Sequence, residues 1–482
     1  MSTRREGRHA VEYVQLPHYP QSRRRLGSLV MPFARLYTRR YTRRAVVAAV
    51  AFAAALAAPP VFAQSAPEQY LPLLTYRVGP YAPSGISIWA GFLDTVRYFN
   101  EVEGGVDGVK IVTEECETGW LAEKGVECYE RLKGGKNGSP APLMLPSSAP
   151  ISYALTDKVV ADKIPMITVN YGRTEATDGA TFPWNFPIML TFYSQASGII
   201  NFIAQKEGGF DKLKGKKIVT LYHDSAYGRE TIAPLALLAK EYGFEDIEIP
   251  NPHPGNEQSA QWQQIREAKP DWVYLRGWGI QTPVAIKTAA RVGFPANHII
   301  GDIWSSSEDD VIPAGDAAKG YLAVTTYPAG TDFPIHKKLK EYVLDKGKSD
   351  LKDLSRFGTV YYNAGVVEAI ITIEALRTAY AKFGAKPING EQARYGIEHL
   401  NIDEKRLEEL GVKGLLQPLK LSCSDHEGGG ALRVQQWDGK KWTPVSDWIQ
   451  ADRATLRPLI DEKAAAYAKE KGVTPRDCSH ES

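Results

Sequence analysis

Apolar and polar positions follow two different rhythms along the chain after residue 70. Short apolar runs are typical of buried strands, and stretches follow them in which apolar residues such as Ile88, Phe92 and Val96 recur at helical spacing. The pattern predicts strands over residues 73–78, 110–113, 143–145, 166–169, 217–222, 272–275 and 298–300, and helices over residues 151–161, 229–242 and 282–292. Strands that alternate with helices form parallel sheets covered on both faces, so the sequence predicts an α/β protein.

Length and composition indicate that this α/β protein has at least two lobes. The chain has 482 residues, of which 43% are hydrophobic and 24% charged, as in ordinary globular proteins. A single hydrophobic core stops growing at roughly 250–300 residues. The composition disfavours disorder, collagen-like repetition and a multi-span membrane protein. The length predicts at least two hydrophobic cores.

The first 63 residues differ from the rest in charge. They hold 11 arginines, no lysine and two acidic residues, a formal charge of +9, whereas the remaining 419 residues hold 47 basic and 54 acidic residues, a formal charge of −7. An acidic body lacks the basic footprint that a nucleic-acid partner requires. No nucleic-acid partner is therefore expected.

The basic segment has the pattern of a secretory signal peptide. Arginines at residues 39–44 precede an apolar stretch of 14 residues, 45–58, and the small-x-small sequence Val61-Phe62-Ala63 follows Pro59-Pro60. A membrane-spanning helix needs about 20 apolar residues, so an uncleaved anchor is the weaker interpretation. Met31 is a second candidate start, which would leave residues 1–30 untranslated. The export route, Sec or twin-arginine, stays open.

All four cysteines follow the signal segment, which places them in an oxidising compartment. An even count there indicates disulfides, and Cys116 with Cys128 would close a short loop. A pairing of Cys423 with Cys478 stays open. No C-x-x-C motif or His/Cys cluster occurs, so neither a metal site nor a cofactor is expected.

Aromatic and hydroxyl side chains follow the predicted strands directly. Parallel α/β sheets bind ligands outside the carboxyl ends of their strands. The aromatic residues in these positions are Tyr81, Tyr171, Tyr227, Trp278 and Trp304. Rings with a polar atom suit a cleft that holds a small organic molecule. Each ring by itself could equally cover the core from a loop, but five of them together favour binding.

Catalytic signatures are missing from the sequence. It contains no G-x-S-x-G elbow, phosphate-binding loop, G-x-G-x-x-G or H-E-x-x-H motif. His223-Asp224 would be an acid/base pair, but a histidine at a strand end beside a turn aspartate is more often structural. An enzyme is therefore not expected.

Several segments resemble a family of type I periplasmic solute-binding proteins, the branched-chain amino acid binders of ABC importers. The most specific is residues 100–111, which matches N-x-x-GG-v-x-G-x-k-i after the first helix. Residues 223–228 resemble the strand-end (H/N)D-x-x-YG loop, residues 316–321 an "A-x-G" segment, and residues 425–437 the C-terminal "DH-x-G" region. The resemblance covers residues 73–448, and the segment around Cys116 and Cys128 is similar to a small disulfide loop of the family.

This resemblance implies two Rossmann-like lobes with parallel sheets, joined by a three-segment hinge. Lobe 1 is expected over residues 70–190 and 327–420, lobe 2 over residues 191–326 and 421–455, and a C-terminal helix and tail over residues 456–482.

The resemblance also implies a ligand site between the lobes. Lobe 1 would hold a ligand carboxylate with backbone N–H and hydroxyl groups, and lobe 2 would add aromatic rings. The expected binding residues are Tyr81, Ser147, Ser148, Asn170, Tyr171, Thr174, Tyr227, Trp278, Asp302 and Trp304. Amino acid binders carry an acidic residue that pairs with the ligand ammonium, but Ile303 takes that place here and Asp302 comes one residue early.

The function expected from this resemblance is a periplasmic receptor that captures a small solute and delivers it to ABC permease subunits in the inner membrane. Burial of an ammonium without an acidic partner costs several kcal/mol, so the family's amino acid specificity does not carry over directly. Amino acid, amide and carboxylate ligands all stay open. A ligand-sensing domain is the alternative. It is less favoured because a sensor would normally carry a second membrane span or an output domain.

Overall fold

The computed structural model describes residues 66–479. The predicted signal peptide lies outside this part of the chain and stays a prediction. Between residues 66 and 479, no helix combines the length and the apolar character that a membrane crossing requires.

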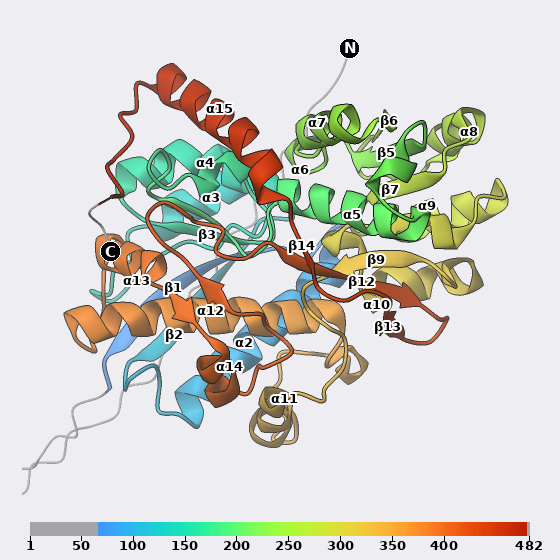
Figure 1. Cartoon of the computed structure of the whole chain (residues 1–482). Helices are drawn as coiled ribbons and strands as arrows, with labels where there is room; N and C mark the ends of the chain where they lie inside the picture. The colour runs from blue at the N-terminus through green and yellow to red at the C-terminus, as the bar shows by residue number, and fades with distance from the viewer. Residues whose placement is uncertain (1–65, 480–482) are drawn as a thin grey trace, which may run out of the picture. The chain divides into compact units, whose positions relative to one another are not determined.

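A first parallel sheet is built from the N-terminal part of the described chain (Figure 1). Strand β1 pairs with β2, and residues 143–145 join β1 to β3 through the bridges Leu73↔Leu145 and Met144↔Met166. Strand β4 pairs with β3 on the other side. The strands are β1 (Glu68–Thr75), β2 (Lys110–Glu117), β3 (Met166–Val169) and β4 (Asn185–Ile188).

Helices cover both faces of this sheet, and alternate residues along its first strand point into two different cores. Leu71 and Leu73 of β1 belong to the large core that includes α2 and α12, whereas Tyr70 and Leu74 belong to a separate core with α3 and α4. Strands buried on both faces are typical of parallel α/β sheets. The helices are α2 (Ala82–Glu101), α3 (Ala122–Leu132), α4 (Ala149–Asp162), α12 (Val360–Phe383) and α13 (Gly390–Glu398).

A second, larger sheet has the strand order β13-β12-β9-β8-β7-β5-β6, and β14 pairs with β12. Five strands are parallel, of which β5, β7 and β8 are predicted strands and β6 and β9 are not, whereas β12 is antiparallel to β9, and β13 and β14 are antiparallel to β12. The strands are β5 (Lys217–His223), β6 (Glu245–Asn251), β7 (Trp272–Arg276), β8 (Ile299–Gly301), β9 (Leu322–Thr325), β12 (Ala431–Trp437), β13 (Trp442–Pro444) and β14 (Ile449–Gln450).

Two contacting pairs of helices pack against the second sheet, α5 with α7 and α8 with α9. These helices are α5 (Phe192–Glu207), α7 (Ile232–Tyr242), α8 (Ser259–Ala268) and α9 (Gln281–Arg291). Shorter elements connect the larger ones. They are α6 (Ala226–Arg229), α10 (Glu308–Val311), α11 (Pro334–Leu339), α14 (Glu404–Leu410), β10 (Asn401–Ile402) and β11 (Leu419–Lys420).

The chain passes between the two sheets three times, after β4, after β9 and before β12. The crossing segments lie against one another. Met189 N donates to Glu427 O (2.8 Å), Gly430 N donates to Met189 O (2.6 Å), and Asn170 Nδ2 donates to Thr326 Oγ1 (2.9 Å). The topology is that of two α/β halves joined at three points. The residue boundaries predicted for the lobes stay a prediction.

The C-terminal helix α15 (Arg453–Lys471) connects elements of both halves. At its start, Asp452 N donates to Ser197 Oγ of α5 (3.0 Å). At its end, Tyr467 OH and Lys471 Nζ donate to the Asp157 carboxylate of α4 (2.5 and 2.8 Å). The helix begins three residues before the predicted Leu456, because Asp452 caps it by accepting from Thr455 N.

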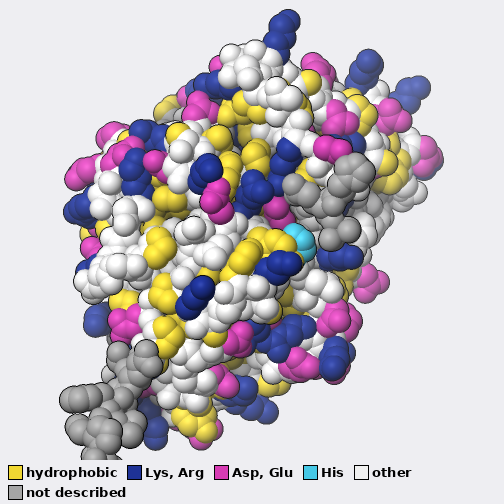
Figure 2. All heavy atoms as spheres, turned by 90° about the vertical axis from the view of Figure 1, so that its left-hand side faces the viewer, with side chains coloured by type: hydrophobic (Ala, Val, Ile, Leu, Met, Phe, Trp, Pro, Cys, Tyr) yellow, Lys and Arg dark blue, Asp and Glu magenta, His cyan; other side chains and the backbone are white. Residues whose placement is uncertain are grey.

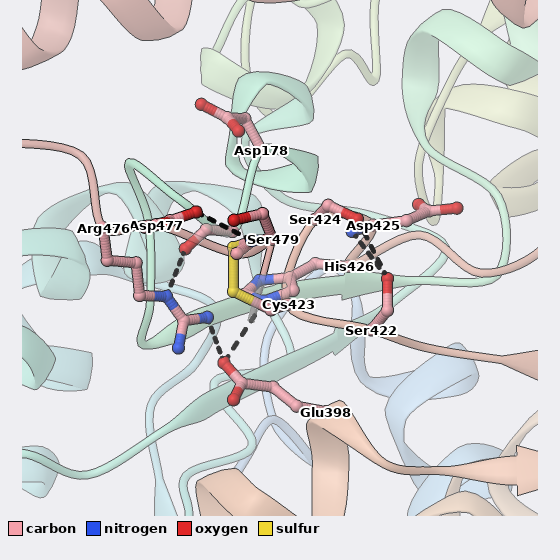
Figure 3. Close-up of a disulfide and its surroundings, with 12 residues drawn as sticks. Asp178, Glu398, Ser422, Cys423, Ser424, Asp425, His426, Arg476, Asp477 and Ser479 are labelled. Carbon is pink, nitrogen blue, oxygen red and sulfur yellow. Dashed lines mark hydrogen bonds and ion pairs between the residues drawn. A yellow bond between two sulfur atoms is a disulfide. The ribbon is translucent and has the colours of Figure 1, made fainter. Parts of the chain in front are cut away.

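A disulfide fastens the segment after α15 to the body of the protein. Cys423 is bonded to Cys478, a pairing that the sequence analysis did not decide. Cys116 is bonded to Cys128, as predicted. Beside the first bridge, Arg476 pairs with the buried Glu398 and donates to Gly179 O (3.0 Å) (Figure 3). The tail is thus held by a covalent bond and by a partly buried ion pair.

We expect Cys423→Ser combined with Cys478→Ser to lower the free energy of unfolding by about 2–4 kcal/mol, because the bridge removes the entropy of a long loop from the unfolded chain. Chemical denaturation measures this. In the control, Cys116→Ser with Cys128→Ser, the bridged residues are 12 apart rather than 55. The control should lose about 1 kcal/mol less, because loop entropy grows with the logarithm of loop length. An equal or larger loss in the control contradicts the prediction.

Candidate ligand-binding site

A cavity lies where the segments that follow the strands of both sheets meet. Its walls enclose about 490 Å³ of space that atoms do not fill, part of it open to solvent. Side chains from the first sheet, the second sheet and helices α2 and α12 form these walls. The lining residues are Ile88, Trp120, Ser147, Ser148, Ala149, Tyr171, Tyr227, Trp278, Trp304, Tyr327, Ala364 and Glu368.

Six of the ten predicted binding residues line this cavity. They come from four strand ends and from the start of one helix. The six are Ser147, Ser148, Tyr171, Tyr227, Trp278 and Trp304. The structure therefore brings together residues that are up to 157 positions apart in the sequence. No ligand tests their binding role, which stays a prediction.

The other four predicted residues do not line the cavity, and each of them hydrogen-bonds to other parts of the protein. Tyr81 OH is 2.8 Å from His223 Nε2 and also bonds His253. Asn170 Nδ2 donates to Thr326 Oγ1 and Tyr327 OH, and Thr174 Oγ1 donates to Glu230 Oε2 (3.3 Å). These residues support the cavity from outside.

Asp302 is the fourth, and its position corrects the expectation that it faces the ligand. Its carboxylate lies 3.2 Å from Arg276 Nη1, and both side chains are 0% exposed. Tyr227 OH donates to the same carboxylate (2.6 Å). Burial raises the pKa of Asp302 to about 6, while Arg276 opposes that rise. Asp302 therefore neutralises Arg276 and orients Tyr227, and it is not free to pair with a ligand ammonium.

The rings of the lining hold one another at steep angles. Trp304 is nearly perpendicular to Trp278 (89°, centroids 5.4 Å apart) and steeply inclined to Tyr171 (75°, 5.9 Å). Behind them, Tyr81 is stacked on Trp278 at 6.2 Å. Edge-to-face packing of this kind fixes each ring, and because Tyr171 and Tyr81 belong to one half and Trp304 and Trp278 to the other, it joins the two halves.

Hydrogen-bond donors gather at the start of α4. Ser148 caps this 14-residue helix by accepting from Ile151 N, and the first helical residue, Ala149, lines the cavity. The first N–H groups of a helix have no partner within the helix and favour an anion. In α4 Ser148 already bonds the Ile151 N–H and Pro150 has no N–H, so the Ala149 N–H is the first-turn donor beside the cavity. The Trp278 indole N–H is buried without a hydrogen-bond partner in the described part of the chain, and the Ser147 and Tyr171 hydroxyls lie against each other and have no other partner there. Together these groups can bind a carboxylate.

The comparisons with known proteins agree with this architecture. The family model described as "Periplasmic binding protein" matches residues 68–441. The chain belongs to the periplasmic binding protein family. This is a family of solute-binding proteins that serve ABC transporters, and it is not an enzyme family. None of the curated proteins matches the sequence.

Solved structures include several proteins similar to this periplasmic binding protein. A protein from the Pseudomonas fluorescens group described as an ABC transporter permease is 66% identical over 86% of this chain and 99% of its own, with a TM-score of 0.81. A branched-chain amino acid ABC transporter protein from Thermus thermophilus is 20% identical over 82% and 99% (TM-score 0.68). A solute-binding protein from R. palustris is 19% identical over 80% and 98% (TM-score 0.59).

Sequence reasoning missed several lining residues, of which Trp120, Tyr327 and Glu368 carry polar groups. Tyr327 directly follows β9, so the strand-end rule would have found it had the strand over residues 322–325 been predicted. Glu368 lies inside α12. The feature that could have identified it is an acidic residue within the apolar sequence Val-Val-Glu-Ala-Ile-Ile. Burial raises the pKa of Glu368 to about 8.

We expect Asp302→Asn to lower the free energy of unfolding by about 3–5 kcal/mol, because it leaves the Arg276 cation buried without a counter-charge. Urea unfolding measures the loss. Asp224→Asn is the matched control: Asp224 pairs with Arg229 at 2.5 Å, but their side chains are 34% and 58% exposed. An exposed pair contributes at most about 1 kcal/mol. Similar losses in the two variants contradict a stabilising role for the buried pair.

Proposed function

We propose that this periplasmic binding protein captures a small organic carboxylate between its two α/β halves and delivers it, unchanged, to the permease of an ABC transporter. The cavity supports this proposal most directly. It combines aromatic walls with buried donors of the lining, the Ser147–Tyr171 hydroxyl pair and the Trp278 N–H, and with the first N–H group of α4. The carboxylate of the ligand would accept from these donors, and its apolar part would lie among Tyr227, Trp278 and Trp304.

The ligands of two similar solved proteins are consistent with a carboxylate. The Thermus thermophilus protein is described with bound valine and the R. palustris protein in complex with benzoate. Valine and benzoate share a carboxylate and an apolar body but differ in the amine. The shared part corresponds to the donors at α4, and the position of Asp302 beside Arg276 argues against an amine partner at that residue.

The two halves touch each other around the cavity, as a captured ligand requires. Trp304 Nε1 donates to Asn170 O (3.2 Å), and α6 of the second half contacts α4 of the first. Gly279 has a φ of +55°, and a Cβ at this position would lie 2.8 Å from Pro80 O. A side chain at Gly279 would therefore hold the halves apart. We infer that the halves open and close about the three crossings to admit and release the ligand.

The proposal also includes export of the protein to the periplasm, delivery of the ligand to a permease, and binding without catalysis. The family supports a periplasmic location, and the signal-peptide pattern of residues 1–63 agrees with it. The family also favours transport over sensing and over enzymatic activity. On the face seen in Figure 2, basic and acidic side chains are interspersed rather than gathered in a basic footprint. This face offers no support for a nucleic-acid partner.

A thermal-shift screen of the purified protein tests the proposal. The panel holds benzoate, aliphatic carboxylates, amides and amino acids. A ligand at 100 times its dissociation constant should stabilise the protein by about 2.7 kcal/mol and raise its melting temperature. Only compounds with a carboxylate should do so. Stabilisation by amides alone, or chemical turnover of any compound by the purified protein, contradicts the proposal.

Trp278→Ala should weaken binding of the screened carboxylate at least about 30-fold, because truncation of a central aromatic residue in a binding site typically costs about 2 kcal/mol or more. Isothermal titration calorimetry measures the affinity. Trp448→Ala is the control, since Trp448 packs on Arg433 away from the cavity. An unchanged affinity in Trp278→Ala removes this residue from the site.

A further inference from the structure

One cavity residue carries a titratable charge that the proposed function has not used. Glu368 is the only acidic or basic side chain among the described residues that line the cavity. It is 7% exposed, and its Oε1 has no hydrogen-bond partner. An acceptor that is buried and unpaired is costly unless the bound ligand or a proton satisfies it.

The surroundings of Glu368 contain no cation to hold it ionised. The ionisable groups that respond to its charge are the phenols of Tyr76, Tyr171 and Tyr327, which follow β1, β3 and β9. No lysine, arginine or histidine within residues 66–479 pairs with it. Burial alone raises its pKa to about 8, so the carboxyl group is mainly protonated at pH 7.

A protonated Glu368 changes what the cavity can bind. The polar side-chain groups of the lining that have no partner outside it are then the Ser147–Tyr171 hydroxyl pair, the Trp278 N–H and the Glu368 O–H, and each of these three can donate to a ligand. Such a set suits an anion. An ionised Glu368 would instead place a second negative charge in the same apolar space, and no cation there would offset it.

We propose that Glu368 is a specificity-determining residue that stays protonated when the ligand binds and thereby selects carboxylates that lack an amine. This inference rests on the proposed function, because it concerns the same cavity. An ammonium group would require the opposite state, an ionised Glu368, and would release a proton on binding. The two states predict opposite dependence of affinity on pH.

The direction in which affinity changes with pH follows from the linkage between binding and protonation. A carboxylate that binds only the protonated form keeps a constant affinity below about pH 8 and loses about tenfold per pH unit above it. A zwitterion that binds only the ionised form gains about tenfold per pH unit up to about pH 8 and is constant above it. The tyrosine pKa values are raised beyond their usual 10, so these phenols do not titrate in this range.

Calorimetry with benzoate, isovalerate and valine between pH 6.5 and 9.5 tests the inference. Isovalerate is valine without its amine, so this pair isolates the ammonium. We expect isovalerate to bind at least about tenfold more tightly than valine at pH 7, and the affinity of each carboxylate to fall above pH 8. Glu368→Gln, which is permanently uncharged, should bind within about threefold of the wild type at pH 7 and lose the dependence on pH.

Glu374→Gln is the control on the same helix. Glu374 pairs with Arg377 and Arg406 outside the cavity, so this variant should keep the pH profile of the wild type. Tighter binding of valine, with proton release and with loss of affinity in Glu368→Gln, would overturn the inference and leave the proposed function standing. If none of the three compounds binds either wild type or Glu368→Gln, the carboxylate site itself is wrong and both proposals fall.

Discussion

Parallel strands deliver the segments that follow them to one edge of a sheet, and the cavity depends on this constraint. Apart from Ile88 of α2 and the residues of α12, every lining residue comes shortly after a strand or after the bridged residues 143–145. Because the chain crosses between the sheets three times, the carboxyl edges of two sheets face each other. The site is therefore a consequence of topology, and the side chains at those edges decide what it binds.

The same constraint explains how much of the site the sequence could predict. Strand ends can be located from apolar runs, so Ser147, Tyr171 and Trp278 were found before the structure. The runs also indicate β3 and β7, which are short and buried on both faces, but not the parallel strands β4, β6 and β9. The antiparallel strands at the edge of the second sheet were missed, because local periodicity does not show which neighbour a strand pairs with.

The role of Asp302 could not be predicted, because it depends on a pairing between distant residues. Arg276 ends a fully buried strand, and its guanidinium lies 4.5 Å from the ring centres of both Phe192 and Tyr227. A buried cation needs a counter-charge, and Asp302, 26 residues later, is the group that lies next to it. The position that follows β8 is thereby used for stability, although position alone suggested ligand binding.

The proposed recognition of an anion without any cation in the lining has a physical cost and an advantage. Each neutral donor contributes less than an arginine would, so several donors must converge, and the packing of Tyr171, Trp278 and Trp304 holds them when the halves are together. In return, the empty cavity holds no unpaired charge that closure would desolvate. Discrimination then comes from donors that a wrong ligand leaves unsatisfied, which is a stronger filter than the fit of an apolar surface. A proton on Glu368 completes this scheme, because it turns the one acidic group of the lining into a further donor.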